Sequence, residues 1–202
     1  MYQIIHVLGI ALLCAFLSAC FHKTLPIAQE NPSLDWSKRN QRLQALSQWT
    51  LRGKAAFQSP KESGSASFEW QQQEDRFSFA AFNPLGNEEF RLQGQPAQVK
   101  LYMANGKQYT ASTSEALFSR TVGFAFPFSS LMYWVRGIPD PNLPATTQFD
   151  TSHRLAQLQQ ADWRVDFQNY TTVDGIDLPR FIVMTSSLYK AKVMIYEWRL
   201  IL

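Results

Sequence analysis

The stretch Ala66-Ser67-Phe68-Glu69-Trp70 places an apolar side chain at every second position, and Phe77-Ser78-Phe79-Ala80-Ala81 repeats this spacing a few residues later. Successive side chains of a β-strand point to opposite faces of the sheet, so this period of two is typical of strands that are buried on one face. Strands that follow one another so closely pair antiparallel. We therefore predict a protein made mainly of antiparallel β-strands.

The same alternation recurs along much of the chain from Thr50 onward, and two turn signals support it. Asn105-Gly106 and Asp174-Gly175 each stand between two such runs, and both dipeptides favour the positive φ angles of a tight hairpin. A sheet of this length curls, and its inner face needs a cover. Further strands are expected around Phe90–Leu92, Val99–Met103, Thr147–Asp150, Leu155–Gln160, Trp163–Phe167, Phe181–Thr185 and Ala191–Trp198.

One amphipathic helix is predicted before the sheet. It should run from Trp36 to about Gln48, because Trp36, Leu43 and Leu46 share one side, and either Ser33 or Asp35 could cap its first turn.

A helical insertion is predicted in the middle of the sheet, over Ser112–Ile138. Ser112-Thr113-Ser114-Glu115 matches a capping box, so one helix should begin there and run towards Thr121. A second short helix, from about Ser129 to Val135, should end at Gly137. The insertion carries enough apolar side chains to cover the inner face of the sheet.

An apolar run near the N-terminus begins at about Ile4 and ends with Leu17-Ser18-Ala19-Cys20. A run that ends in small residues and is too short to span a bilayer indicates a secretory signal. The cysteine that follows resembles the lipidation site of bacterial lipoproteins, although a cleaved signal with an incidental cysteine remains the alternative. We predict a signal peptide at 1–19, a lipidated Cys20 with a tether over 20–34, and one domain over 35–202.

Composition limits the classes of function. The net charge of +3 in 202 residues is too small to indicate a nucleic-acid partner. The two cysteines are Cys14, inside the signal, and Cys20, so we expect no disulfide, thiol catalysis or cysteine metal site in the domain. Ser187 and Lys190 have the serine–lysine spacing of penicillin-binding enzymes without the companion motifs. We therefore expect no catalytic site, no metal and no cofactor.

The aromatic content is high, at 14% of the residues. Two interpretations remain open at this stage. The rings could fill a dry core, or they could line the inner face of a curled sheet around a cavity for an apolar ligand. Both structures use the same side chains.

A leucine stands at the tip of a turn in Phe82-Asn83-Pro84-Leu85-Gly86-Asn87. Asn-Pro and Gly both mark the turn. Leu85 either packs back onto a neighbouring loop or projects as a small apolar probe for a membrane or a partner, with Pro84 and Gly86 shaping the tip.

Several of these features occur in an order that resembles the LolB family of outer-membrane lipoprotein receptors, over about residues 35 to 200. They are the lipidation signal at Leu17–Cys20, the Trp36 helix, Phe68-Glu69-Trp70-Gln71-Gln72, Asn83-Pro84-Leu85-Gly86, Asn105-Gly106 before Tyr109-Thr110-Ala111, Trp134 before Gly137-Ile138-Pro139, and Trp163 and Trp198 in late strands.

The resemblance implies an unclosed antiparallel β-barrel with a helical lid over a hydrophobic cavity. It implies a monomer that accepts triacylated lipoproteins from the periplasmic carrier LolA and inserts them into the outer membrane, where its own acyl anchor holds it. Leu85 would correspond to the membrane-inserting leucine of the family. Candidate cavity residues are Trp70, Phe79, Trp134, Phe68 and Phe126.

Two other functions stay open: an envelope lipoprotein that binds another lipid, and a structural subunit of an envelope assembly complex. A hydrolase is disfavoured because no catalytic set is present.

Overall fold

The computed structural model describes residues 32–121 and 126–201. Residues 32–202 form one compact unit with its own core. The predicted signal peptide, Cys20 and nearly all of the tether lie outside the described residues, so these remain predictions. No helix in the described ranges is long and apolar enough to cross a membrane.

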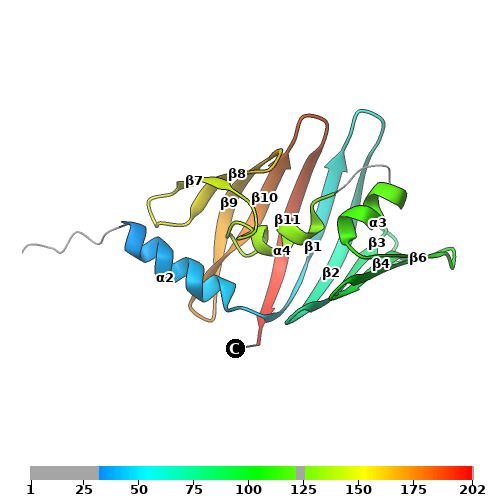
Figure 1. Cartoon of the computed structure of the whole chain (residues 1–202), viewed down its shortest axis with the longest axis horizontal. Coiled ribbons are helices and arrows are strands. Elements are labelled where there is room, and N and C mark those ends of the chain that lie inside the picture. Colours follow the sequence, from blue (N-terminus) through cyan, green and yellow to red (C-terminus); the bar gives the residue numbers. More distant parts are fainter. Residues whose placement is uncertain (1–31, 122–125, 202) are drawn as a thin grey trace, which may run out of the picture. The chain divides into compact units, whose positions relative to one another are not determined.

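The architecture is a single antiparallel sheet in which nearly every strand pairs with its sequence neighbours (Figure 1). The exception is the pairing of β1 with β11, which joins the two halves of the sheet. β6 and β7 are its two edges, so the sheet is open, as predicted. The strands are β1 (Gln48–Gln58), β2 (Ser63–Gln73), β3 (Arg76–Phe82), β4 (Glu88–Gln95), β5 (Gln98–Met103), β6 (Gln108–Ala111), β7 (Ala145–Phe149), β8 (Leu155–Gln160), β9 (Trp163–Val173), β10 (Ile176–Thr185) and β11 (Lys190–Leu200).

The two predicted hairpin turns are present. Gly106 has φ +80° and donates its N–H to the carbonyl of Met103 at 2.9 Å. Asp174 and Gly175 both have positive φ, at 49° and 70°, which is the backbone of a type I′ turn. The alternation therefore predicted strands, and the two dipeptides predicted two of the turns that join them.

Two helices, α3 (Ser114–Thr121) and α4 (Phe128–Trp134), lie in the segment that connects the edge strands β6 and β7 (Figure 1). The expected capping box is wrong by one position. Thr113, not Ser112, caps α3, because its Oγ1 accepts the N–H of Ala116 at 3.1 Å. Glu115 is instead used between helices, as described below.

The first helix, α2, covers Pro32–Gln44, four residues earlier than predicted at both ends. Proline is well suited to the first position of a helix because the missing N–H has no partner there in any case. Ser33 and Asp35 therefore lie inside the first turn instead of capping it, and Gln48 already belongs to β1. Leu43 and Leu46 are buried as expected, Leu46 just beyond the helix.

The core lies between the inner face of the sheet and the helices. Trp49, Trp70 and Trp134 are its largest fully buried side chains. In this domain, burial of apolar side chains is the main source of stability, at about 25 cal/mol per Å² of apolar surface.

Candidate functional site

The inner face of β2 and β3 carries a cluster of aromatic rings. The helices α3 and α4 cover this face and form the lid, or cover, of the sheet, and one ring of the lid packs on the cluster. Phe128, at the start of α4, is 2% exposed. Its ring stacks on Trp70 at 4.7 Å between centroids, and it contacts Phe77 at 5.1 Å and Phe79 at 5.5 Å. Phe118 of α3 adds a fourth contact at 6.1 Å. Phe128 therefore joins both helices to the floor of the sheet.

The five candidate cavity residues lie on this face or on its cover. Phe68, Trp70 and Phe79 are neighbours on the sheet, since Phe79 lies 5.4 Å from Phe68 and 5.7 Å from Trp70. Phe126 belongs to the cover and contacts Phe118 at 5.9 Å. Trp134 is completely buried in α4.

The indole N–H of Trp134 helps to attach α4 to the sheet. Its Nε1–H donates to Oε1 of Gln160 on β8 at 2.8 Å. The same Gln160 oxygen accepts the N–H of Asp140 at 2.9 Å, and Gln160 donates to the carbonyl of Asp140 at 2.8 Å. Asp140 in turn accepts the hydroxyl of Ser130 at 2.8 Å. A satisfied buried network of this kind fixes the end of α4 to the sheet.

A second polar link holds α3 to α4. The carboxylate of Glu115 accepts both the backbone N–H of Ser129 at 2.9 Å and its hydroxyl at 2.7 Å. A carboxylate in the first turn of a helix satisfies free N–H groups and favours the positive end of the helix dipole. These hydrogen bonds are exposed, so this link is weaker than the buried network around Gln160.

A buried arginine joins the end of α4 to the end of α2. One Nη1 of Arg136 donates to the carbonyls of Leu43, Gln44 and Leu46 at 3.0–3.4 Å, and its Nε donates to the carbonyl of Met132 at 3.1 Å. Burial lowers the pKa of Arg136 to about 10, so the side chain is still charged at neutral pH. A cation at this position complements the C-terminal carbonyls of α2.

The other side of α2 packs on the β7–β10 part of the sheet. Arg39 donates to the carbonyl of Asp177 at 2.6 Å and pairs with its carboxylate at 3.6 Å. Trp36 contacts Phe149 at 4.8 Å between ring centroids. His153 Nδ1 lies 3.3 Å from the carboxylate of Asp35. In the described part of the chain, no group of three or more His, Cys, Asp or Glu is placed to hold a metal.

Leu85 projects into solvent from the β3–β4 turn and is 86% exposed. The turn is held by Asn83, whose Oδ1 accepts the N–H groups of Leu85 and Asn87, both at 3.0 Å. Gly86 has φ +85° and donates its N–H to the carbonyl of Asn83 at 2.9 Å. Leu85 therefore does not pack back onto a neighbouring loop, and its role as an apolar probe stays a prediction.

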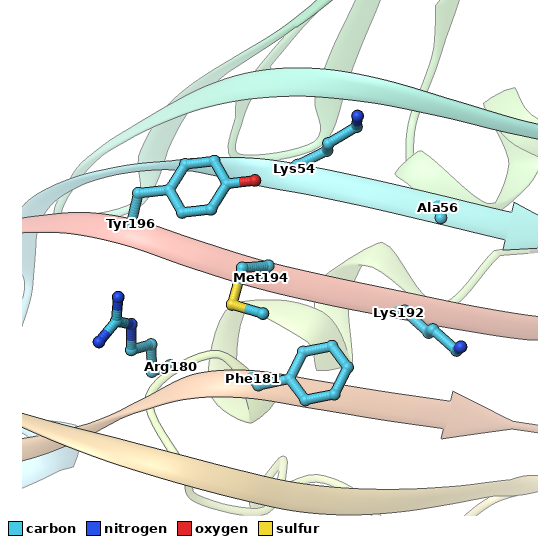
Figure 2. A pocket seen from close by; sticks show the side chains of 7 residues that line it. All are labelled: Lys54, Ala56, Arg180, Phe181, Lys192, Met194 and Tyr196. Atoms are coloured by element: carbon cyan, nitrogen blue, oxygen red, sulfur yellow. The ribbon is translucent and has the colours of Figure 1, made fainter.

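Two hollows in the described structure lie away from the aromatic cluster. One, of about 380 Å³, opens on β1, β10 and β11 (Figure 2). Its residues Lys54, Lys192 and Met194 alternate along their strands with the buried Gly53, Val193 and Ile195, so it is on the outer face of the sheet. The other, of about 220 Å³, lies between α2 and the β9–β10 turn. On the inner face the protein's own rings contact one another.

Sequence reasoning did not select Phe128 as a candidate cavity residue, although its ring makes four contacts in this cluster. The alternation within Phe124-Ala125-Phe126-Pro127-Phe128 marks an apolar segment, but only the position of α4 decides which ring meets the floor. Phe77 and Phe118 were missed for the same reason.

An open antiparallel sheet with two helices across its aromatic inner face defines a half-barrel whose cover and floor are both apolar. Comparison with known proteins identifies the family within this class. The family model "Outer membrane lipoprotein LolB" matches residues 47–198. The chain therefore belongs to the LolB family, and its place is the outer membrane, where a lipid anchor holds it.

Similar curated proteins are outer-membrane lipoproteins LolB. That of Coxiella burnetii (strain RSA 493 / Nine Mile phase I) is 32% identical over 196 residues, which cover 95% of this chain and 92% of the relative. That of Pseudomonas fluorescens (strain Pf0-1) is 36% identical over 169 residues, covering 84% and 82%.

Solved structures confirm the fold. A LolA superfamily protein from Nitrosomonas europaea has a TM-score of 0.56 at 7% identity, with 83% of this chain and 93% of that chain covered. An outer membrane lipoprotein-sorting protein domain from Vibrio parahaemolyticus has a TM-score of 0.57 at 10% identity, with 84% and 93% covered.

Proposed function

We propose that this protein accepts lipoproteins from a LolA-type periplasmic carrier, shelters their acyl chains against the inner face of its sheet, and inserts them into the outer membrane. It acts as a monomer, without catalysis. The observation that carries the proposal is the apposition of Phe128 on the lid with Trp70, Phe77 and Phe79 on the sheet. This aromatic contact holds the lid on the sheet in the closed state. When the lid moves away, the same rings become two apolar surfaces that can contact acyl chains.

The acyl chains of the cargo have to be kept out of water during transfer. Each buried methylene is worth about 0.8 kcal/mol, so one acyl chain costs on the order of 10 kcal/mol to expose to water. Transfer between two apolar walls keeps the three chains of a triacylated lipoprotein covered throughout. It needs only a difference of affinity between carrier and acceptor, and no nucleotide.

In this proposal the structure represents the empty, closed state. Ring-on-ring packing fills the inner face, so acyl chains replace Phe128 as the partner of Trp70 and Phe79. The exposed Glu115–Ser129 link has to break, while the buried attachment through Gln160 can persist. Cys20 carries the acyl anchor of the protein itself, and the following segment serves as its tether.

Leu85 acts at the release step. A leucine that enters the apolar part of a membrane gains roughly 1.5–3 kcal/mol, which suits a transient contact and not an anchor. The turn fixed by Asn83 presents this leucine at its tip.

The test is a transfer assay with the chain from residue 21 onward, which retains the compact unit. This protein should take a radiolabelled lipoprotein from its loaded carrier, as measured by a change of partner in gel filtration. Failure of transfer, or co-purification of a phospholipid that the carrier complex does not displace, would contradict the proposal and favour the binding of another lipid.

For the release step, Leu85→Glu in the lipid-anchored protein should leave acceptance unchanged and slow insertion into vesicles at least about tenfold, because the buried leucine is lost. Leu188→Glu is the matched control, since Leu188 is also an exposed turn leucine, at 58%. Equal insertion rates for wild type and Leu85→Glu would rule out this role.

A further inference from the structure

The hollow on the outer face of the sheet is amphipathic. Lys54 on β1, Met194 on β11 and Phe181 on β10 form one row across three strands, since Lys54 is opposite Met194 and Met194 is opposite Phe181. Ala56 and Lys192 are opposite each other in the next row. Figure 2 shows the side chains of Phe181, Met194 and Tyr196 in the middle of the hollow, with basic side chains around them.

The cations of this hollow are Lys54, Arg180 and Lys192, from three adjacent strands. Each lacks an ion pair and a side-chain hydrogen bond within the described part of the chain. Elsewhere on β1 and β11, Arg52 pairs with Glu69 and Glu197, and Arg199 pairs with Glu197. The residues that line the hollow include three cations and no carboxylate.

The apolar side chains in the middle of the hollow are partly exposed to solvent. Tyr196 is 62% exposed, which is unusual for an aromatic ring, and Phe181 and Met194 are half-buried beside it. Tyrosine, lysine and arginine side chains combine an apolar body with a polar tip, and such residues suit the boundary between water and lipid. A volume of about 380 Å³ is at the small end of ligand sites.

We propose that this hollow binds the headgroup of an anionic phospholipid in the membrane that anchors the protein. The phosphate lies among Lys54, Arg180 and Lys192, and the glycerol backbone rests on Phe181, Met194 and Tyr196. The lipid anchor keeps headgroups at a high effective concentration around the domain, so weak binding suffices. The apolar middle favours a lipid over an acidic peptide, which would leave the rings uncovered. The site is on the opposite face of the sheet from the cargo site.

The experiment measures binding of the chain from residue 21 onward to vesicles of phosphatidylcholine with and without 30% phosphatidylglycerol, at two salt concentrations. Wild type should bind the anionic vesicles more tightly, and less so at high salt. The variant K54Q/R180Q/K192Q should lose affinity by about fivefold for each cation, on the order of 100-fold in total. Phe181→Ser, which keeps the charges, should weaken binding severalfold.

The matched control is K61Q/R76Q/K107Q, which removes the same charge from three exposed residues outside the hollow, Lys61 and Lys107 in turns and Arg76 at the start of β3. This control should retain most of the affinity. Equal losses in both triple variants would show a net-charge effect and overturn the site. Unchanged vesicle binding in K54Q/R180Q/K192Q would overturn it as well. This holds even if the variant no longer binds an acidic protein, because the hollow would then be a protein-binding site.

The carrier assay separates this inference from the proposed function. K54Q/R180Q/K192Q should accept a lipoprotein from its carrier as wild type does, because the hollow does not face the aromatic cluster. Loss of vesicle binding with intact acceptance supports the headgroup site. Loss of acceptance in this variant would assign the hollow to carrier docking and contradict the inference.

Discussion

At the scale of single residues, the six tryptophans have different polar surroundings although most of them are buried. The indole N–H of Trp134 donates to Gln160 at 2.8 Å, and that of Trp198 donates to the carbonyl of Pro179 at 3.2 Å. The N–H groups of Trp49 and Trp70 are buried without a hydrogen-bond partner in the structure. A buried donor without a partner costs free energy that a phenyl ring avoids.

Replacing Trp70 or Trp134 with phenylalanine separates these two situations. Both variants lose the same ring volume, but only Trp134→Phe loses a hydrogen bond. We expect Trp134→Phe to lower the free energy of unfolding by about 1–3 kcal/mol more than Trp70→Phe does. Urea denaturation followed by circular dichroism measures the difference. An equal or greater loss in Trp70→Phe would show that its N–H has a partner, such as a buried water.

Residue-level contacts also show where sequence reasoning ends. The ring of Phe77 lies over Gly94, directly opposite on β4, and a Cβ at that position would come within 1.9 Å of it. The alternation of Phe77 predicts an inner-facing ring, but the register that pairs it with a glycine is a long-range property. The same limit applies to Phe128, whose partners are about 50 residues away in the sequence.

At the scale of elements, local signals predicted the strands well and helix ends less well. β8 has the predicted bounds, Leu155–Gln160. α2 was shifted because proline can open a helix, and α3 is capped one residue later because Glu115 bonds to Ser129 instead. The turn residues around Leu85 predicted the turn, but they left open whether the leucine packs back or is exposed as the structure has it.

The β7–β8 turn provides a prediction about pH at this scale. Asp150 accepts the N–H groups of Ser152 and Arg154, both at 2.9 Å, and the guanidinium of Arg154 at 2.8 Å. Burial acts to raise the pKa of Asp150, but these hydrogen bonds and the charge of Arg154 outweigh it, so the pKa is lowered. Because the folded pKa is below the unfolded value of 3.8, the stabilisation is present above about pH 4 and is lost as the pH falls through the folded pKa.

Asp150→Asn should therefore lower the Tm at pH 6 by about 2–4 °C, which corresponds to about 1 kcal/mol in a domain of this size. The difference from wild type should shrink as the pH falls below 4. Asp75→Asn is the control, because Asp75 is exposed in the β2–β3 turn. Calorimetry between pH 3 and 6 provides the measurement, and a difference that stays constant with pH would contradict the assignment.

At the scale of the whole molecule, the attachments of the cover are unequal, and this inequality sets the direction in which it opens. The end of α4 is fixed by buried hydrogen bonds from Trp134 to Gln160 and from Arg136 to the end of α2. The start of α4 is held to the sheet by apolar contacts, among them Phe128 on Trp70. α3 is held by apolar contacts and by an exposed hydrogen bond from Arg120 to the carbonyl of Thr110 on β6 at 3.2 Å, and the exposed Glu115–Ser129 link joins it to α4. The cover should therefore pivot about Trp134–Arg136.

Hydrogen exchange on binding of a diacylated lipopeptide tests this direction. As acyl chains displace Phe128, the amides of α3 should exchange at least severalfold faster, while those at Trp134–Arg136 and in β8 should be unchanged. Glu115→Gln weakens the link between the helices, so it should speed exchange in α3 even without ligand, whereas Glu89→Gln on β4 should not. Faster exchange at Trp134–Arg136 would mean that the cover leaves as a rigid piece and that the buried network is not its hinge.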